Sequence, residues 1–247
     1  MNTLIRQTMM ENRFFLRRKD VLFWTLAFPI LFILLFGALY GETKWQGLNI
    51  RAIDFLLPGI VVMGVMITGI MHTANGFVAD REKGIFRRLA LTPLKRPTLI
   101  GGLMLHDFCV IIIQTLLLVE ISSLVFKTHL TGNLLLFWLV LSVGALCFMS
   151  IGFALTGLVK SVRSSSPVTQ ITLNTMMFLG GIFFPNSMMP HWLGNIAKVL
   201  PSSQMGDALR AVIYNNPGIG DIWQKLVIMA VWIGVCLVIS IRFFRWE

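Results

Sequence analysis

Two carboxylates stand inside one of the most apolar stretches of the chain, where a charge is expensive to place. Asp107 and Glu120 both lie within residues 99–126, a segment long enough to cross a bilayer. A charged group at membrane depth must face protein or water, and such groups often mark ion or proton pathways. On one helix the two are separated by about 20 Å, so they cannot act as a carboxylate pair. Structural pairing and a proton or substrate relay both stay open.

Uncharged polar side chains recur at helical spacing in two further apolar segments. The first group, with i, i+4, i+7 spacing, is Thr68, His72 and Asn75. The second group, with i, i+4 spacing, is Gln170 and Asn174. Such stripes predict hydrogen bonds that hold transmembrane helices together, or the wall of a substrate pathway. The spacing does not separate these two interpretations.

Neither a metal site nor a catalytic site is indicated by residue spacing. The four histidines stand in four separate segments, and the three cysteines lie in apolar runs without a C-x-x-C pattern, which is typical of buried thiols. The sequence contains no phosphate loop of the form G-x-x-x-x-G-K-[ST], no H-E-x-x-H and no G-x-S-x-G. We therefore expect no metal, no cofactor and no catalytic residue on this chain.

The segments that carry these residues are those of an integral membrane protein. Of 247 residues, 56% are hydrophobic and 13% are charged, whereas a soluble domain carries about 25% charged residues. Six apolar runs approach the length of about 20 residues that a helical span needs: 21–40, 55–77, 99–126, 134–159, 168–184 and 226–241. The last run is short, so we expect flanking basic residues to snorkel and the bilayer to thin there. The prediction is an all-α protein with six transmembrane helices in a single transmembrane domain over residues 1–247.

The net charge of +10 indicates a membrane orientation and not nucleic-acid binding, because the basic residues form short clusters between the apolar runs. Alternate segments, beginning with the N-terminal one, hold 15 Lys and Arg, and the others hold 6. The positive-inside rule then places both termini in the cytoplasm. Residues before the first run carry apolar and basic side chains on separate arcs, which predicts an amphipathic interfacial helix.

Two segments between the runs are more than simple loops. Residues 79–97 combine charged helix formers with apolar side chains such as Phe86, and Thr92-Pro93 ends the helix. An apolar edge held outside the bilayer suits docking into a groove of another protein. Residues 183–214 are divided by prolines into helices too short to span, which predicts two short re-entrant helices on the outer side.

These two segments resemble the type-2 permease family of ABC exporters, in its drug-resistance-like branch. ADREKGIFRRLALTPLKRPTLIGG is similar to the family's cytoplasmic loop, with a Glu-Lys-Gly run, a short apolar-edged helix and a Thr-Pro stop. SSSPVTQITLNTMMFLGGIFFPNSMMPHWLGNIAKVLPSSQMGDALRAV resembles the fifth span, its Phe-Phe-Pro end and the short helices that follow. LLPGIVVMGVM fits the second span, so the resemblance covers essentially the whole chain.

The resemblance implies the permease subunit of an exporter in a bacterial plasma membrane, which moves an amphipathic drug, antibiotic, peptide or lipid. Two ABC ATPase subunits, holding the ATP and Mg²⁺, would bind beneath a dimer of this chain with itself or a related permease. The coupling helix would contact the ATPase through Arg81, Glu82, Lys83, Phe86, Arg87 and Leu89, with Phe86 exposed. The first, second and fifth spans would line the dimer seam and substrate path with Thr68, His72, Asn75, Gln170 and Asn174. The re-entrant helices would form an outer gate with Phe184, Pro185, Trp192 and Pro201.

Two other classes of function stay open on the residues alone. An ion-coupled secondary transporter would use Asp107 and Glu120, although no inverted repeat is evident. An intramembrane enzyme would need a nucleophile and a base, and the sequence displays no such pair. Dependence on a partner ATPase separates the permease from the secondary transporter.

Overall fold

A computed structural model describes residues 8–12, 15, 17, 19–41, 43, 51–89, 96–128, 132–183, 190–214 and 218–243. The secondary-structure elements among these residues are all helices, in agreement with the predicted all-α class. The elements are α2 (Lys19–Leu22), η1 (Phe23–Ala27), α3 (Phe28–Tyr40), α4 (Ala52–Met66), η2 (Ile67–His72), α5 (Thr73–Glu82), α6 (Ile85–Leu89), α7 (Arg96–Phe126), α8 (Leu134–Leu158), α9 (Val162–Leu179), α10 (His191–Ala197), α11 (Pro201–Tyr214) and α12 (Ile219–Phe243).

Five helices in the described part of the chain are long and apolar enough to cross a membrane. They are Phe23–Tyr40, Ala52–Glu82, Ile100–Phe126, Leu134–Leu158 and Ile219–Arg242. The predicted fifth span is helical as α9, but its first turns are rich in serine and it carries Arg163, so α9 is not among the five. The chain is therefore a multi-pass helical membrane protein, and the count of six spans stays a prediction.

The limits of three spans differ from the prediction. The fifth was predicted over residues 168–184, whereas α9 begins at Val162 and ends at Leu179. The second span continues to Glu82, because α4, η2 and α5 form one helix that extends through the predicted start of the loop. The last helix begins at Ile219, well before residue 226. A helix of 25 residues is about 37 Å long, so the expected thinning of the bilayer is not needed.

The second span is the centre of the bundle. Of its most apolar stretch, 94% is buried, against 22% for Phe23–Tyr40 and 17% for Ile219–Arg242. Apart from Thr68, its sequence is apolar on all sides between residues 55 and 70, as expected for a helix with neighbours all round. Glycines allow close contact with α8, since a Cβ on Gly152 of α8 would lie 2.3 Å from the carbonyl oxygen of Gly69.

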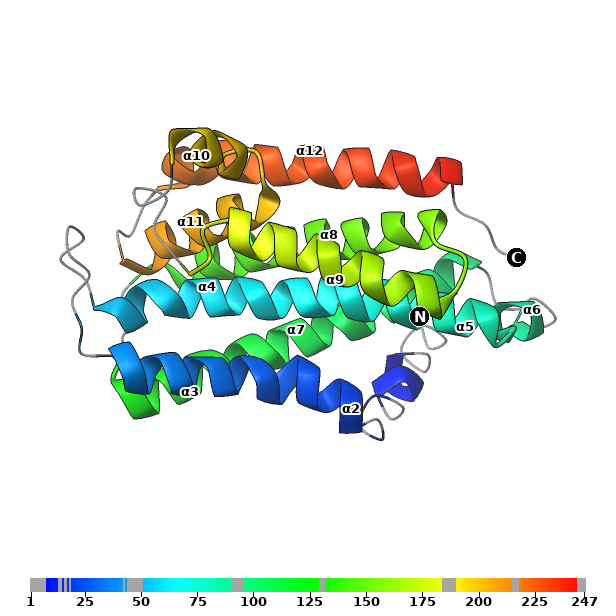
Figure 1. Cartoon of the computed structure of the whole chain (residues 1–247), viewed down its shortest axis with the longest axis horizontal. Helices are drawn as coiled ribbons and strands as arrows, with labels where there is room; N and C mark the ends of the chain where they lie inside the picture. The colour runs from blue at the N-terminus through cyan, green and yellow to red at the C-terminus, as the bar shows by residue number, and fades with distance from the viewer. Residues whose placement is uncertain are drawn as a thin grey trace.

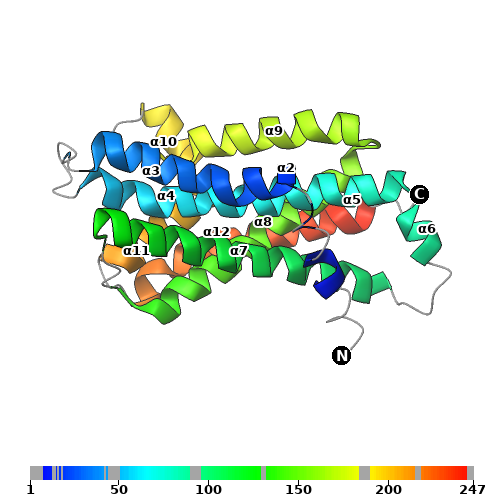
Figure 2. The ribbon, with the colours of Figure 1, turned by 90° about the horizontal axis from the view of Figure 1, so that it is seen from below.

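The short elements gather at opposite ends of the bundle. In Figures 1 and 2, α10 and α11 lie at one end, while α2, α5, α6 and the last turn of α12 lie at the other. The 7 residues of α10 and 14 of α11 give lengths of about 10 and 21 Å. The predicted pair of short helices is thus present, and α2 begins at the end of the bundle where α12 finishes.

The segment before α2 packs against the third span. Residues 8–12 are helical, the Thr8 hydroxyl donates to the Gly102 carbonyl oxygen at 3.4 Å, and the Phe15 side chain is buried. Met9 is exposed. Residues 8–12 are thus helical, as predicted, and the apolar residue Phe15 contacts protein; the interfacial role of this segment stays a prediction.

Candidate functional site

The predicted coupling segment is anchored to the junction between α8 and α9. Arg81, at the end of α5, donates to the carbonyl oxygens of Thr156 at 3.2 Å and Val159 at 2.5 Å. The last carbonyl groups of a helix have no partner within it, so Arg81 supplies the bonds that α8 lacks. Glu82 accepts from the backbone N–H of Val162 at 3.2 Å, and its negative charge also suits the N-terminus of α9.

The expected exposure of Phe86 was wrong. Its side chain is only 7% exposed, and its ring centroid lies 4.5 Å from that of Phe77 on α5. Phe77 in turn makes an edge contact with Phe153 of α8 at 4.8 Å. Gly84 has φ +66°, which only glycine adopts without strain, and this turn folds α6 back onto α5. Phe86 therefore holds α6 against the bundle within this chain.

The remaining coupling residues divide into two groups. Lys83 follows α5 and is exposed, as is Glu82. The side chains of Arg87 and Leu89 lie outside the described residues, although both positions belong to α6. Glu82 at the end of α5 and Lys83 in the turn before α6 are thus the predicted contacts that are exposed in the described part.

The polar stripe of the second span makes hydrogen bonds to two neighbouring helices. The Thr68 hydroxyl donates to Gln114 Oε1 of α7 at 3.3 Å, and the Ser165 hydroxyl of α9 donates to Asn75 Oδ1 at 2.7 Å. Thr68 is fully buried. These bonds connect helices within one chain, as the interhelical interpretation predicts, and they do not test whether Asn75 also lines a pathway.

A different surface is presented by α9. Gln170 donates to Asn174 Oδ1 at 3.0 Å on the outward-facing side of the helix, where Gln170, Ile171, Thr175 and Phe178 are exposed. Between the first turns of α9, η1 and η2 lies a cavity of about 270 Å³, whose lining includes Trp24, Met71 and Asn75.

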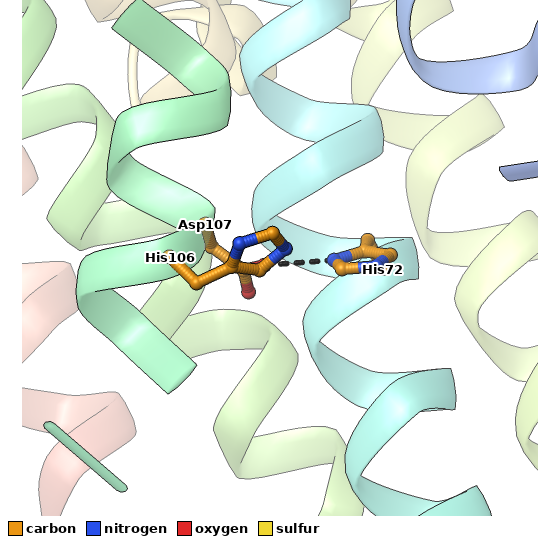
Figure 3. Close-up of side chains that lie close together, drawn as sticks. All are labelled: His72, His106 and Asp107. Carbon is orange, nitrogen blue, oxygen red and sulfur yellow. Dashed lines mark hydrogen bonds and ion pairs between the residues drawn. The ribbon is translucent and has the colours of Figure 1, made fainter. Parts of the chain in front are cut away.

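A buried polar cluster joins the second and third spans, and sequence spacing did not reveal it (Figure 3). His72 Nδ1 lies 2.7 Å from Asp107 Oδ1, and the Thr73 hydroxyl donates to Asp107 Oδ2 at 2.6 Å. The imidazole rings of His72 and His106 are 5.8 Å apart between centroids. The four histidines are separate in sequence, but the fold brings these two together beside Asp107.

The second predicted intramembrane charge does not belong to this cluster. Glu120 is exposed on α7, whereas the side chain of Asp107 is only 4% exposed. The conclusion that the two carboxylates cannot form one pair therefore agrees with the structure. Because Asp107 has partners on the second span, the structural pairing that we considered is present for this residue.

At the other end of the bundle, Arg210 of α11 holds three backbone segments together. Its guanidinium donates to the carbonyl oxygens of Gly181 at 3.1 Å, Ile182 at 2.9 Å and Phe55 at 3.4 Å, and to Asp207 Oδ1 at 3.1 Å. The group also lies 3.9 Å from the centroid of the Phe55 ring. The α11 helix lies outside the five candidate spans. Burial lowers the pKa of the Arg210 guanidinium, and the nearby Asp207 carboxylate opposes part of this effect.

The predicted gate residues are only partly described. Phe184 and Pro185 lie outside the described residues. Trp192 on α10 is 66% exposed, and Pro201 at the start of α11 is buried. Arg210 was not predicted for this end, and the signal that could have found it is a lone arginine in a segment otherwise rich in apolar residues.

The family model described as ABC-2 type transporter matches residues 3–214. The chain belongs to the ABC-2 type transporter family. This ABC-2 permease is 25% identical over 250 residues to the daunorubicin resistance ABC transporter permease protein DrrB1 of Streptomyces coeruleorubidus, covering 98% of this chain and 84% of that one. It is 24% identical over 252 residues to the putative transport permease YvfS of Bacillus subtilis, covering 97% and 96%.

A third relative extends the same comparison. The probable multidrug ABC transporter permease YbhR of Escherichia coli is 20% identical over 183 residues, covering 74% of this chain and 50% of that one. The expected resemblance is confirmed, and so is the expected function of a membrane permease subunit of an ABC exporter. The family implies association with ABC ATPase components.

Proposed function

We propose that this ABC-2 permease exports an amphipathic molecule, of the class of drugs, antibiotics, peptides or lipids, using ATP and Mg²⁺ bound by two separate ATPase subunits. The observation that carries this proposal is the fixed segment formed by α5 and α6 at one end of the bundle. Arg81 and Glu82 join this segment to the α8–α9 junction. A force applied to α6 would therefore reach the second span, α8 and α9 together. Coupling to an ATPase requires such a connection.

The exposed polar face of α9 supports a dimer with a second permease chain. Gln170 and Thr175 are exposed together with Ile171 and Phe178. Polar side chains at membrane depth must face protein or water and not lipid. We infer that α9 faces the second permease chain across the dimer seam.

The cavity between η1, η2 and α9 supports the substrate path along this seam. Its volume of about 270 Å³ is close to the lower limit for a drug-sized pocket, and a second chain would enlarge and enclose it. His72 and Asn75 line it together with Trp24 and Met71. A wall of this kind, mostly apolar with a few polar groups, suits an amphipathic ligand. Trp192 and Pro201 would belong to the gate at the far end of the path.

Transport assays test the proposed energy source. Daunorubicin is fluorescent and amphipathic, so its efflux from cells expressing the permease with its ATPase provides the measurement. We expect efflux to stop when the ATPase carries a substitution in its phosphate loop, and to continue when a protonophore collapses the proton gradient. The reverse result would favour an ion-coupled secondary transporter that uses Asp107.

Labelling experiments test the orientation and the dimer. We propose that both termini and α6 are cytoplasmic, so an impermeant thiol reagent added outside intact cells should label Lys198→Cys and spare Lys83→Cys. For the dimer, Phe178→Cys should form a disulfide between two permease chains. Val231→Cys on α12 is a control of similar exposure. Labelling of Lys83→Cys from outside, or equal cross-linking at both positions, would contradict these assignments.

A further inference from the structure

Three side chains that bind metals meet where the second and third spans pack together. His72 ends η2, and His106 and Asp107 are neighbours on α7. One ligand atom from each residue lies within 4.8 Å of the other two, and in Figure 3 the residues approach from facing helices. Two imidazoles and a carboxylate are a donor set suited to Zn²⁺ and related transition metals. We propose that His72, His106 and Asp107 bind a divalent transition-metal ion of the Zn²⁺ class.

The hydrogen bonds around the cluster orient its donor atoms. His106 Nδ1 lies 2.5 Å from Asn12 Oδ1. An amide oxygen can only accept, so this contact places the proton on Nδ1 and leaves the Nε2 lone pair of His106 for a metal. Histidine ligands usually donate their second nitrogen to an oxygen in this way. The Thr73 hydroxyl holds Asp107 Oδ2 at 2.6 Å, which leaves Oδ1 turned toward His72.

The contact between His72 and Asp107 is where an ion would enter. Their Nδ1 and Oδ1 atoms are 2.7 Å apart, which is a hydrogen-bond distance. Two ligands at about 2.0–2.1 Å in tetrahedral geometry are roughly 3.3 Å apart. Replacing the proton by a metal ion therefore requires these atoms to separate by only about half an ångström.

Packing around the two imidazoles keeps their rings in place. The buried Phe15 ring makes edge contacts with both, at 5.7 Å from His72 and 5.4 Å from His106 between centroids. A fixed ring orientation preorganises a ligand set, because less rotational freedom is lost on binding. Phe15 and Asn12 belong to the segment before α2, so the ion would fasten that segment as well as the two spans.

A cavity lined partly by polar groups reaches the cluster. It has a volume of about 370 Å³, contains His72, His106 and Asp107 in its wall, and also includes Glu11, Asp80 and Lys83. The cavity lies toward the end of the bundle that holds α5 and α6. Three protein ligands leave at least one coordination position, which water or a donor atom of a bound molecule could fill from this cavity.

The test uses the purified full-length permease without a histidine tag, in detergent and stripped with EDTA. Titration with Co²⁺ reports coordination directly, because a four-coordinate site with imidazole ligands gives visible absorption much stronger than that of hydrated Co²⁺. Zn²⁺ competition then gives the affinity. The variants are His72→Gln and His106→Gln, and the matched control is His191→Gln, which removes an exposed histidine on α10.

We expect one Co²⁺ per chain, displaced by one Zn²⁺. Each of the two cluster variants should lose affinity by at least about 100-fold, since removing a ligand exceeds the 10–100-fold effect of an outer partner. The control should bind as the unchanged chain does, and Zn²⁺ should raise the melting temperature of both.

Absence of the absorption band in the unchanged chain would overturn the proposal and leave the cluster as a hydrogen-bonded network. Equal loss in His191→Gln would overturn it too, and so would equal binding by the cluster variants. If both variants fail to fold, the stoichiometry and spectrum of the unchanged chain still decide. The measurement needs neither ATPase nor transport, so it is independent of the proposed function.

Discussion

Replacing Arg210 by Met should loosen the end of the bundle where α10 and α11 lie. Arg210 donates to the carbonyl oxygens of Phe55, Gly181 and Ile182 and to the carboxylate of Asp207. Methionine keeps most of the apolar volume of the side chain but donates no hydrogen bond. The substitution therefore removes the partner of three backbone carbonyls and leaves Asp207 without this ion pair.

The loss of unfolding free energy in Arg210→Met depends on how many of the lost hydrogen bonds water can replace. Breaking a buried ion pair by removing one partner costs about 3–5 kcal/mol, and an unsatisfied buried polar group costs about 1–3 kcal/mol. The Asp207 side chain is 35% exposed whereas that of Arg210 is 13% exposed, so water recovers part of the loss at the carboxylate. We therefore expect Arg210→Met to lower the free energy of unfolding by about 3 kcal/mol, the lower end of the range for a broken buried ion pair. At roughly 2–4 °C per kcal/mol for a chain of this length, the melting temperature should fall by about 6–12 °C.

The assay is thermal unfolding of the purified permease in one detergent, followed by size-exclusion chromatography of the remaining monodisperse fraction. Arg210→Lys keeps a positive charge without the planar fork, so it should recover less than half of the loss. Asp207→Asn removes only the partly exposed partner and should cost about 1 kcal/mol or less. A melting temperature for Arg210→Met within about 1 °C of the unchanged chain would refute the stabilising role of the Arg210 hydrogen bonds.

Three further changes test the packing, the coupling segment and α9. Gly152→Val should sharply reduce the folded yield, because the added Cβ would lie 2.3 Å from the Gly69 carbonyl oxygen. Gly194→Ala is the control and should not reduce it, because a Cβ there has nothing within 4 Å. Fluorescence-detected size-exclusion chromatography compares the two yields. Phe86→Ala should release α6 from its aromatic contact with Phe77 and so reduce co-purification of the ATPase several-fold, because the docking segment is then no longer held in place; full retention would refute the anchoring role. Asn174→Leu should change substrate preference in efflux assays without loss of dimer, and loss of the dimer alone would show that the residue serves assembly.

The class of the protein and the position of its helices are largely determined by local sequence. Long runs without charge are compatible with few structures other than membrane helices, because every backbone polar group must be bonded within the segment. The criterion failed at the last span, where it stopped at Lys225 although the helix continues back to Ile219. Backbone hydrogen bonds do not end at a charged residue when that residue can reach the interface.

The family was also readable from sequence, because two local motifs identify it. The role of Phe86 was not, since an apolar residue on a charged helix has the same pattern whether it contacts another protein or its own bundle. Only the turn at Gly84 and the positions of Phe77 and Phe153 show that the contact is internal. The pattern gives the presence of an apolar face, whereas the fold decides what covers it.

The polar cluster shows the same division more sharply. A lone histidine at position 72 and the pair at 106 and 107 are separated by more than 30 residues, and helical periodicity relates only residues on one helix. Their meeting depends on the rotation and height at which the second span packs against the third. Those quantities follow from how all the side chains interlock at the helix interface. The sequence alone thus determined which segments are apolar enough to lie in the membrane, and only the tertiary structure decided which side chains are buried and which of them touch.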